Sequence, residues 1–575
     1  MLKLTRYLKQ YKRECFLAPL FKLLEATFEL LVPLVMTGII DVGIANRDKH
    51  YILIRGAILL GMALTGLVSA ITAQYFSARI ATGFGTALRD DLFKHILGLS
   101  RTETDRVGSS TLVTRMTNDS NQIQNGVNMF FRLVLRSPFI VFGSMFMAYL
   151  VDGTEGLLFT IVICALFVVV FFVMRSAVAL YRIVQKKLDD LLLKTSENLE
   201  GVRVLRAFRR ENAESAAYEE AAASLTKEQL RVGRISALMN PVTYAIINLG
   251  LAAVLWNGAY RVNVGHMTQG QIVALVNYIS QILVELIKLA NLIILLSKAS
   301  ACANRINEIF DMKNSMKDGT IEASGITPSI EFSGVGFAYP DAASEAISDI
   351  TFSASAGETI GIIGGTGSGK STLASLIPRF YDAGRGEIRV GGRNIRDYSL
   401  QSLRRVVGIV EQNTLLFAGT IRDDLLWGDQ QASDEDLMAA AETARALDVI
   451  ASKSKGLDEP VEQLGRNFSG GQKQRLSIAR TLARKPRILI LDDSSSALDF
   501  ATDAALRKAI RRDLKGATVL VISQRVTTIK NADRILVLDD GKMAGFDTHE
   551  KLLRECPLYR EICLSQLSEK EALEA

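Results

Sequence analysis

The sequence predicts an all-α membrane domain of six transmembrane helices with long cytoplasmic extensions, fused to an α/β domain. Three observations support this fold class. Of the 575 residues, 49% are hydrophobic, and the mean hydropathy of +0.20 is high for a large soluble enzyme. The apolar residues are concentrated in the first 300 or so positions, in stretches near the ~20 residues that a spanning helix needs. After residue 328 the pattern changes to short apolar strands alternating with turns and helices.

Composition excludes several other classes. So apolar a chain buries enough surface to fold, and only 10 prolines argue against long disordered linkers. The net charge of +6, from 67 basic and 61 acidic residues, is too balanced for a nucleic-acid binder. No CxxC pair occurs, so we expect unpaired thiols rather than a disulfide scaffold at Cys15, Cys164, Cys302, Cys556 and Cys563.

Six apolar stretches are the predicted spans. The first contains charged residues and no cleavage site follows it, so we interpret it as a retained helix rather than a signal peptide. The spans are Phe16–Ile40, Ile52–Ala73, Val134–Val151, Gly156–Met174, Ser236–Tyr260 and Ile272–Leu296.

Loop length and charge predict the orientation. The links after spans one, three and five are short: Asp41–Tyr51, Asp152–Glu155 and Arg261–Gln271. The links after spans two and four are much longer and rich in Lys and Arg, which places them, the basic N-terminus and the C-terminal half in the cytoplasm. Apolar residues at three- and four-residue spacing predict helices in Ile183–Glu200 and Glu211–Arg234.

The predicted domain boundaries follow from this pattern. Residues 1–312 form the transmembrane domain, the polar, Gly- and Pro-containing stretch 313–328 is a linker, and 329–575 form the α/β domain.

The first functional motif of the α/β domain is a predicted phosphate-binding loop. The apolar strand Thr359–Ile363 precedes a match to G-x-x-x-x-G-K-[ST], and a helical run follows it, as this motif requires. Its glycines let backbone amides converge on phosphate oxygens, Lys370 would reach the β- and γ-phosphates, and Ser371 would bind Mg²⁺. A glycine-rich turn without nucleotide is the alternative. The residues are Gly364, Gly365, Thr366, Gly367, Ser368, Gly369, Lys370, Ser371 and Thr372.

Two further motifs support nucleotide chemistry. Arg487–Asp493 is a buried-strand pattern ending in two carboxylates, of which Asp492 would hold Mg²⁺ and Asp493 would position the attacking water. Ser and two glycines at the start of a helix form a second anion cradle, in Phe468, Ser469, Gly470, Gly471 and Gln472.

With these motifs the whole chain resembles the ATP-binding cassette (ABC) family, as a half-transporter of the B-type exporters whose C-terminal domain is a P-loop cassette. The resemblance implies ATP and Mg²⁺ as cofactors. It implies that the Ser469 signature closes over ATP held by the P-loop of a second half-transporter. It also assigns Tyr339 to adenine stacking, Gln412 to sensing Mg²⁺ and the γ-phosphate, and Ser496–Asp499 to the dimer interface.

The chain departs from the family at hydrolytic positions. Asp493 stands where the family has Glu, and Gln524 stands where it has His. An Asp carboxylate is withdrawn by about 1.5 Å relative to Glu, which predicts a ~10²-fold loss where catalysis depends on positioning. The segment Glu459–Gly465 departs too, whereas the signature is intact. Asp493, Gln524 and Gln412 are thus the predicted catalytic positions of a site that binds ATP and hydrolyses it poorly.

This asymmetry resembles the degenerate subunit of bacterial heterodimeric multidrug exporters. It implies ATP-driven export of small amphipathic solutes (drugs or lipids) across the bilayer of the bacterial cytoplasmic membrane, with a partner that carries the Glu and the His. Nucleic acid is not an expected partner. The alternatives are a homodimeric exporter that hydrolyses slowly and an ATP-sensing regulatory subunit. A peptide exporter with its own protease is not expected, because the chain begins at the first span.

Charged residues inside the spans are functional candidates by default. They are Lys22, Glu25, Glu29, Arg136, Glu285 and Lys288. The i, i+3 pairs Lys22–Glu25 and Glu285–Lys288 suit ion pairs at least as well as contacts to a cationic drug. The Phe- and Met-rich stretch Met129–Tyr149 suits packing or lipid contact better than a solute cavity. The loop tips near Gly108 and Phe208 resemble those that dock onto the cassettes, and we expect Phe208 to be an aromatic anchor.

Overall fold

The computed structural model describes residues 2–340, 342–494 and 496–567. Contacts between residues divide the chain into two units. The membrane unit comprises Met1–Leu97 and Ser110–Asp311, and the cassette unit comprises Gly98–Ser109 and Met312–Ala575. A short segment from the first long loop therefore belongs to the cassette unit by its contacts.

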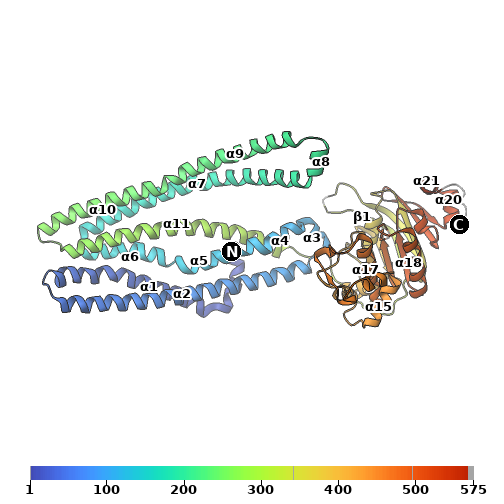
Figure 1. The fold of residues 1–575 in the computed structure, drawn as a ribbon, viewed down its shortest axis with the longest axis horizontal. Coiled ribbons are helices and arrows are strands. Elements are labelled where there is room, and N and C mark those ends of the chain that lie inside the picture. The colour runs from blue at the N-terminus through green and yellow to red at the C-terminus, as the bar shows by residue number, and fades with distance from the viewer. Residues whose placement is uncertain (1, 341, 495, 568–575) are drawn as a thin grey trace. The chain divides into compact units, whose positions relative to one another are not determined.

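Among its described residues the membrane unit consists of helices and the short links between them (Figure 1). In the part of the chain that the structure describes, six continuous helical segments are long and apolar enough to span a membrane, which confirms the predicted number of spans. The helices are α1 (Lys12–Gly38), α2 (Lys49–Gly98), α4 (Ser109–Thr114), α5 (Ser120–Leu133), α6 (Arg136–Val151), α7 (Gly153–Glu200), α8 (Val202–Ala207), α9 (Glu211–Ala237), α10 (Met239–Asn263) and α11 (Gln269–Asp311).

All three short links are shorter than predicted. The link after span one is not Asp41–Tyr51, because a π-helix continues α1 to Ile44 and α2 begins at Lys49. The link after span three is not Asp152–Glu155, because α7 already begins at Gly153: the Asp152 carboxylate accepts from the amides of Thr154 (2.8 Å) and Glu155 (3.2 Å) and caps the helix. The link after span five is shortened as well, since α10 continues to Asn263 and α11 begins at Gln269.

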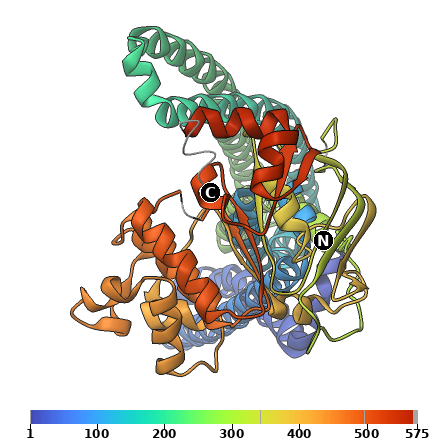
Figure 2. The same cartoon turned by 90° about the vertical axis from the view of Figure 1, so that its right-hand side faces the viewer.

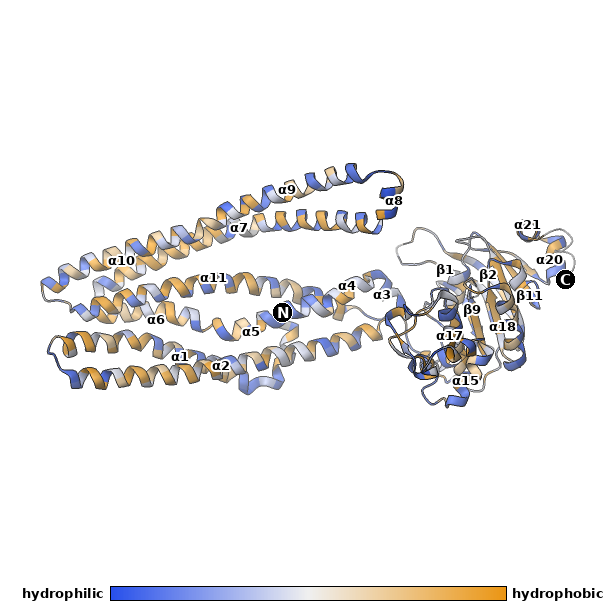
Figure 3. Ribbon diagram, viewed as in Figure 1, coloured by the Kyte–Doolittle hydropathy of each residue, from blue (hydrophilic) through white to orange (hydrophobic). Residues whose placement is uncertain are grey.

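The long polar segments are helical, as predicted. Helix α7 continues without a break through Ile183–Glu200, and α9 covers Glu211–Arg234. These two helices pack against each other, and the hydrophilic residues gather around α8 and along α9, as Figure 3 shows in blue. Apolar side chains of α1, α6, α7, α10 and α11 form the core of the membrane unit.

The cassette unit is built around a six-stranded sheet (Figure 2). Its order is β12-β11-β3-β10-β9-β6, parallel except for β12. The strands are β3 (Thr359–Gly364), β6 (Val407–Val410), β9 (Ile488–Asp492), β10 (Thr518–Ile522), β11 (Arg534–Asp539) and β12 (Lys542–Asp547). An antiparallel sheet of order β2-β1-β4-β5 accompanies it, from β1 (Ile330–Phe337), β2 (Ile347–Ala354), β4 (Arg385–Val390) and β5 (Arg393–Asn394).

Helices and short strands complete the cassette unit. A two-stranded sheet joins β7 (Gly419–Thr420) to β8 (Pro460–Val461). The helices are α3 (Arg101–Val107), α12 (Lys370–Leu376), α13 (Leu400–Val406), α14 (Ile421–Leu426), α15 (Asp434–Thr443), α16 (Leu447–Ala451), α17 (Gly470–Ala483), α18 (Phe500–Asp513), α19 (Val526–Ile529), α20 (His549–Glu555) and α21 (Pro557–Gln566).

Both faces of the six-stranded sheet are buried. Along β9, Leu489 and Leu491 belong to one hydrophobic cluster, and Ile488 and Ile490 belong to the other. Near-continuous apolar strands are typical of a parallel sheet covered on both sides. The carboxyl ends of β3, β9 and β10 lie at one edge of this sheet, and the loops that follow them carry the predicted phosphate chemistry.

Candidate functional site

The P-loop joins the carboxyl end of β3 to the start of α12. Gly367 and Gly369 have φ of +82° and +91°, a conformation that favours glycine. A Cβ on Gly369 would lie 2.4 Å from Ile347 Cγ2 and 2.7 Å from the carbonyl oxygen of Ala346. No atom lies within 4 Å of the position of a Cβ on Gly365 or Gly367. The loop therefore has both the backbone shape and the open side that a phosphate cradle needs.

Lys370 is folded back across this loop. Its ammonium group donates to the carbonyl oxygens of Gly364 (3.0 Å) and Gly365 (2.6 Å), and only 8% of the residue is exposed. Burial lowers the pKa of Lys370, and the carboxylates of Asp492 and Asp493 oppose that shift. The Lys370 ammonium group thus lies against the P-loop backbone at the start of α12. Both the positive charge and the helix N-terminus favour a bound anion there.

The two predicted metal ligands Ser371 and Asp492 lie together. The Ser371 hydroxyl donates to Asp492 Oδ1 at 3.1 Å, across α12 and β9. Burial raises the pKa of Asp492, and the hydrogen bond from Ser371 opposes the rise. A hydroxyl and a carboxylate beside a phosphate cradle suit Mg²⁺, which takes few protein ligands and completes its shell with water and phosphate oxygens. The residues present therefore fit ATP with Mg²⁺.

Asp493 and Gln524 follow the neighbouring strands β9 and β10. Asp493 has a φ of +45°, and its amide donates to the Ile522 carbonyl at 2.9 Å, which fixes the turn. Gln412 Nε2 lies 3.3 Å from Asp493 Oδ2, so the predicted sensor contacts the predicted catalytic carboxylate. Burial raises the pKa of Asp493, opposed by Arg525 and Lys370. The side chain of Gln524 is exposed.

Tyr339 lies at the edge of the same site. Its hydroxyl is 3.0 Å from Thr372 Oγ1, at the end of the P-loop. Its ring makes edge contacts with Phe337 and Tyr381, at centroid distances of 5.0 Å and 5.4 Å, and 36% of the residue is exposed. These contacts hold an aromatic ring beside the P-loop, which is the position an adenine platform needs.

The signature residues form the start of α17. Ser469 is the N-cap, and its hydroxyl accepts from the amide of Gln472 while the Gln472 side chain accepts from the Ser469 amide at 3.0 Å. Phe468 is buried beneath them. A Cβ on Gly471 would lie 3.0 Å from the Ala497 carbonyl oxygen, whereas Gly470 has more room. In the described part of the chain no hydrogen bond joins these residues to the P-loop, so the chain carries two separate anion cradles.

Helix α3 contributes residues that the sequence patterns did not identify. Arg101 forms an ion pair of 2.9 Å with Glu411, the neighbour of Gln412, and Asp105 accepts a hydrogen bond from Tyr381. Glu103 Oε1 accepts from the Ser315 amide at 3.2 Å. The only sequence feature that could have pointed to this contact was the acidic residue Glu411 next to the predicted sensor Gln412. The first long loop therefore contacts the sensor segment through α3, ahead of the predicted tip at Gly108.

Comparison with known proteins identifies the family of this chain. Residues 15–286 match the family described as ABC transporter transmembrane region, and residues 347–496 match the family described as ABC transporter. An uncharacterized ABC transporter ATP-binding protein of Bacillus subtilis (strain 168) is 36% identical over 567 residues, covering 98% of each chain. The chain belongs to the ABC transporter family.

Further relatives of this ABC transporter extend the comparison. The ATP-dependent lipid A-core flippase of Hahella chejuensis is 30% identical over 523 residues, which cover 90% of this chain and 89% of the flippase. The solved structure of a bacterial Atm1-family ABC exporter with ATP bound superposes on this chain with a TM-score of 0.82 at 25% sequence identity. The match covers 98% of this chain and all of the exporter chain. The ABC exporter fold and an ATP-hydrolysing cassette follow from these matches together with the six spans.

Proposed function

We propose that this ABC exporter uses ATP to move amphipathic solutes across the bacterial cytoplasmic membrane as one half of a heterodimer. The observation that carries the proposal is an asymmetry within the cassette. The P-loop and the signature keep every group needed to hold phosphate, whereas Asp493 and Gln524 replace the two hydrolytic side chains. Relatives named as lipid A-core flippases support an amphipathic solute.

The residues divide into two sets by this proposal. One set holds this chain's own ATP: Tyr339 against adenine, Gly364–Thr372 around the phosphates, and Ser371, Asp492 and Gln412 around Mg²⁺. Bound ATP with Mg²⁺ would supply the phosphoryl chemistry that powers transport. The other set, Phe468–Gln472, serves the nucleotide of the partner half-transporter.

Asp493 explains why this site would hydrolyse poorly. Its turn is fixed by the bond to Ile522, so the shorter side chain cannot be carried forward by the backbone. Its carboxylate also faces the Gln412 amide rather than open space. Gln524 can donate a hydrogen bond but cannot become an imidazolium. The expected deficit is ~10²-fold, about 3 kcal/mol.

Trapping of labelled ATP tests the proposal. The chain is purified with the half-transporter that it retains, and photolabelled nucleotide at the Lys370 site is identified after many turnovers. We expect ATP rather than ADP at that site. The double variant Asp493→Glu, Gln524→His should convert the trapped nucleotide to ADP, whereas Asp493→Asn, Gln524→His should not. Rapid ADP formation by the unaltered site would overturn the assignment of a degenerate site.

Transport itself is tested in the same preparation. Vesicles that contain the chain and its partner should move an amphipathic dye when ATP is supplied. A complex that binds ATP and changes partner activity without moving solute would instead be a regulatory subunit. Recovery of this chain alone, as an active dimer with itself, would replace the heterodimer by a homodimer.

A further inference from the structure

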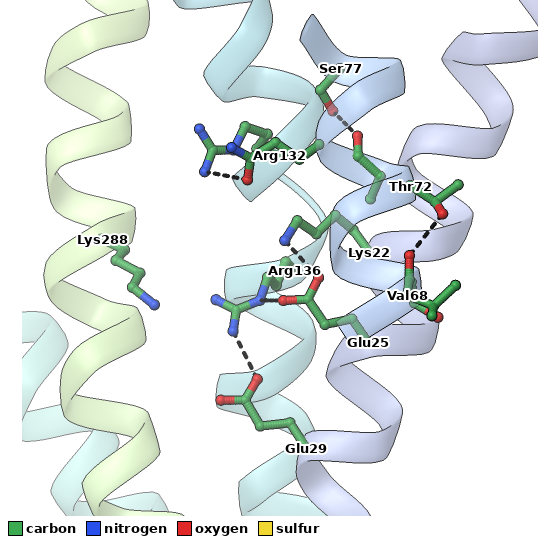
Figure 4. Close-up of polar contacts among 12 residues, drawn as sticks. Lys22, Glu25, Glu29, Val68, Thr72, Ser77, Arg132, Arg136 and Lys288 are labelled. Atoms are coloured by element: carbon green, nitrogen blue, oxygen red, sulfur yellow. Dashed lines mark hydrogen bonds and ion pairs between the residues drawn. The ribbon is translucent and has the colours of Figure 1, made fainter. Parts of the chain in front are cut away.

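Six charged side chains from three helices form one ion network inside the membrane unit. Figure 4 shows the contacts among Lys22, Glu25, Glu29 and Arg136. Arg136 is the centre of the network: the guanidinium donates to Glu285 at 2.5 Å and to Glu29 at 2.8 Å, and approaches Glu25 at 3.6 Å. Two further pairs extend it, Lys22–Glu25 at 2.6 Å and Lys288–Glu285 at 2.7 Å. Three cations and three carboxylates balance, so the network is neutral.

Two members differ from the rest in exposure. The side chains of Lys22, Glu25, Arg136 and Glu285 are at most 17% exposed, whereas Glu29 is 39% exposed and Lys288 is 40% exposed. These two have opposite charges and lie at opposite ends of the chain of contacts through Arg136 and Glu285. A charged group that faces acyl chains is costly, so both groups should face a polar space in the assembled transporter.

Polar atoms beside the network are incompletely satisfied. Gln281 lies one turn from Glu285 on α11, and its side-chain carbonyl is buried without a hydrogen-bond partner among the described residues. The same holds for Asn128 Oδ1 and Arg132 Nε on α5, which packs against α11, whereas Nε of Arg136 faces Glu25 at 3.6 Å. Buried polar groups are normally paired. These unpaired atoms therefore suit a polar space beside the network, as the exposure of Glu29 and Lys288 does.

We propose that Glu29 and Lys288 bind the head group of a zwitterionic amphiphile, with its cationic part against Glu29 and its anionic part against Lys288. This inference rests on the proposed export function and names its substrate class. The deciding argument is charge balance. The network is already neutral, so a singly charged head group would bring an uncompensated charge into a region of low dielectric constant, whereas a zwitterion keeps the site neutral.

A purely structural role accounts for only part of the network. The shielded contacts of Arg136 with Glu25 and Glu285 already connect α1, α6 and α11. That role does not require a half-exposed carboxylate and a half-exposed ammonium group at the two ends. A structural role also predicts that changes at either end affect all solutes equally, which separates the two interpretations by experiment.

The test measures head-group preference. The complex, purified through a tag on this chain, is reconstituted into vesicles, and ATP-dependent movement of three fluorescent probes with one common acyl chain is followed. Their head groups are phosphocholine (zwitterionic), phosphoglycerol (anionic) and trimethylammonium (cationic). We expect phosphocholine to move fastest, and a diacyl and a single-chain form of it distinguish a membrane lipid from a free amphiphile as the source.

Variants at the two ends should shift the preference in opposite directions. Glu29→Gln should slow phosphocholine about tenfold and favour phosphoglycerol, whereas Lys288→Gln should slow it about tenfold and favour trimethylammonium. Lys298→Gln and Glu308→Gln are matched controls, because both side chains are exposed on α11 and make no ion pair in the described part of the chain. These controls should keep the wild-type ranking.

Each outcome decides the inference. Faster movement of a singly charged probe than of phosphocholine by the wild type would overturn it, even if no variant folds. Equal slowing of all three probes by both variants would also overturn it and favour a structural role. If no probe moves with ATP, the proposed function fails instead. Equilibrium binding of the phosphocholine probe, expected to weaken about tenfold in each variant, then decides this site separately.

Discussion

The nucleotide site of the cassette unit and the ion network of the membrane unit both hold charge away from water, but the chain builds them differently. The P-loop is one run of residues, Gly364–Thr372, whose glycine conformations and helix start are set locally. The network takes single residues from three helices, and Arg136 is 107 positions from Glu29 and 149 from Glu285. A change in the first site should affect chemistry, whereas a change at the shielded centre of the second, Arg136, should affect packing.

The largest expected effect is on the network. Arg136→Met leaves the carboxylate of Glu285 buried with one cation fewer, and breaking a buried ion pair in this way costs about 3–5 kcal/mol. We expect a clearly lower melting temperature for the full-length protein in detergent or nanodiscs. Arg132→Met is the matched control, because among the described residues Arg132 makes one side-chain hydrogen bond, of 3.3 Å to Gln74, and no ion pair. Equal melting temperatures for the two variants would contradict the packing role of Arg136.

The second prediction compares the two anion cradles. Ser469→Arg places a bulky cation at the N-cap of α17 and should reduce ATPase of the complex about 10²-fold, near 3 kcal/mol, because this cradle serves the competent site. Lys370→Ala should reduce ATPase less, since its own site mainly binds. The measurement is the steady-state ATPase rate of each variant complex. Each complex is first shown to bind nucleotide with wild-type affinity at the site that was not altered. A larger loss for Lys370→Ala would reverse the assignment of the sites.

The success of the sequence predictions also differs between contiguous motifs and sites assembled from distant residues. Contiguous motifs carry their geometry with them, so the P-loop, the strand before Asp492 and the signature helix were all placed from sequence. The i, i+3 spacing of Lys22–Glu25 and Glu285–Lys288 suited ion pairs at least as well as drug contacts, and both ion pairs are present. The partners of Arg136 were not, because they depend on how α1, α6 and α11 pack.

The same reason explains why helix α3 was missed. Nothing in the local pattern of Arg101–Val107 distinguishes it from an ordinary polar turn, and its partners Glu411 and Tyr381 are hundreds of positions away. The three short links were predicted too long because helices continue into residues that look like a loop, as at Asp152, whose carboxylate caps α7. Local chemistry was therefore readable, whereas long-range pairing was not.

The third prediction concerns the tip of the second long loop. Phe208 ends α8 and is 74% exposed, so packing against its own helix does not account for it. An aromatic anchor in a cassette groove would cost roughly 2 kcal/mol on truncation. We expect Phe208→Ala to keep its melting temperature and its basal ATPase while transport and stimulation by substrate are lost. Leu199→Ala, 71% exposed on α7, is the control and should transport normally. Normal transport by folded Phe208→Ala would exclude the anchor.

The smallest expected effect is at the ion pair between Arg101 and Glu411. Both side chains are nearly half exposed, at 46% and 48%, and exposed pairs contribute about 0.2–1 kcal/mol. A double-mutant cycle with Arg101→Ala and Glu411→Ala, read by thermal unfolding, should give a coupling energy in that range and a smaller one at high salt. Because Glu411 adjoins Gln412, the exchanged pair Arg101→Glu, Glu411→Arg should restore most of the transport that either single reversal loses. A zero coupling energy together with no rescue would show that α3 does not hold the sensor segment, and that coupling must then pass through the second loop alone.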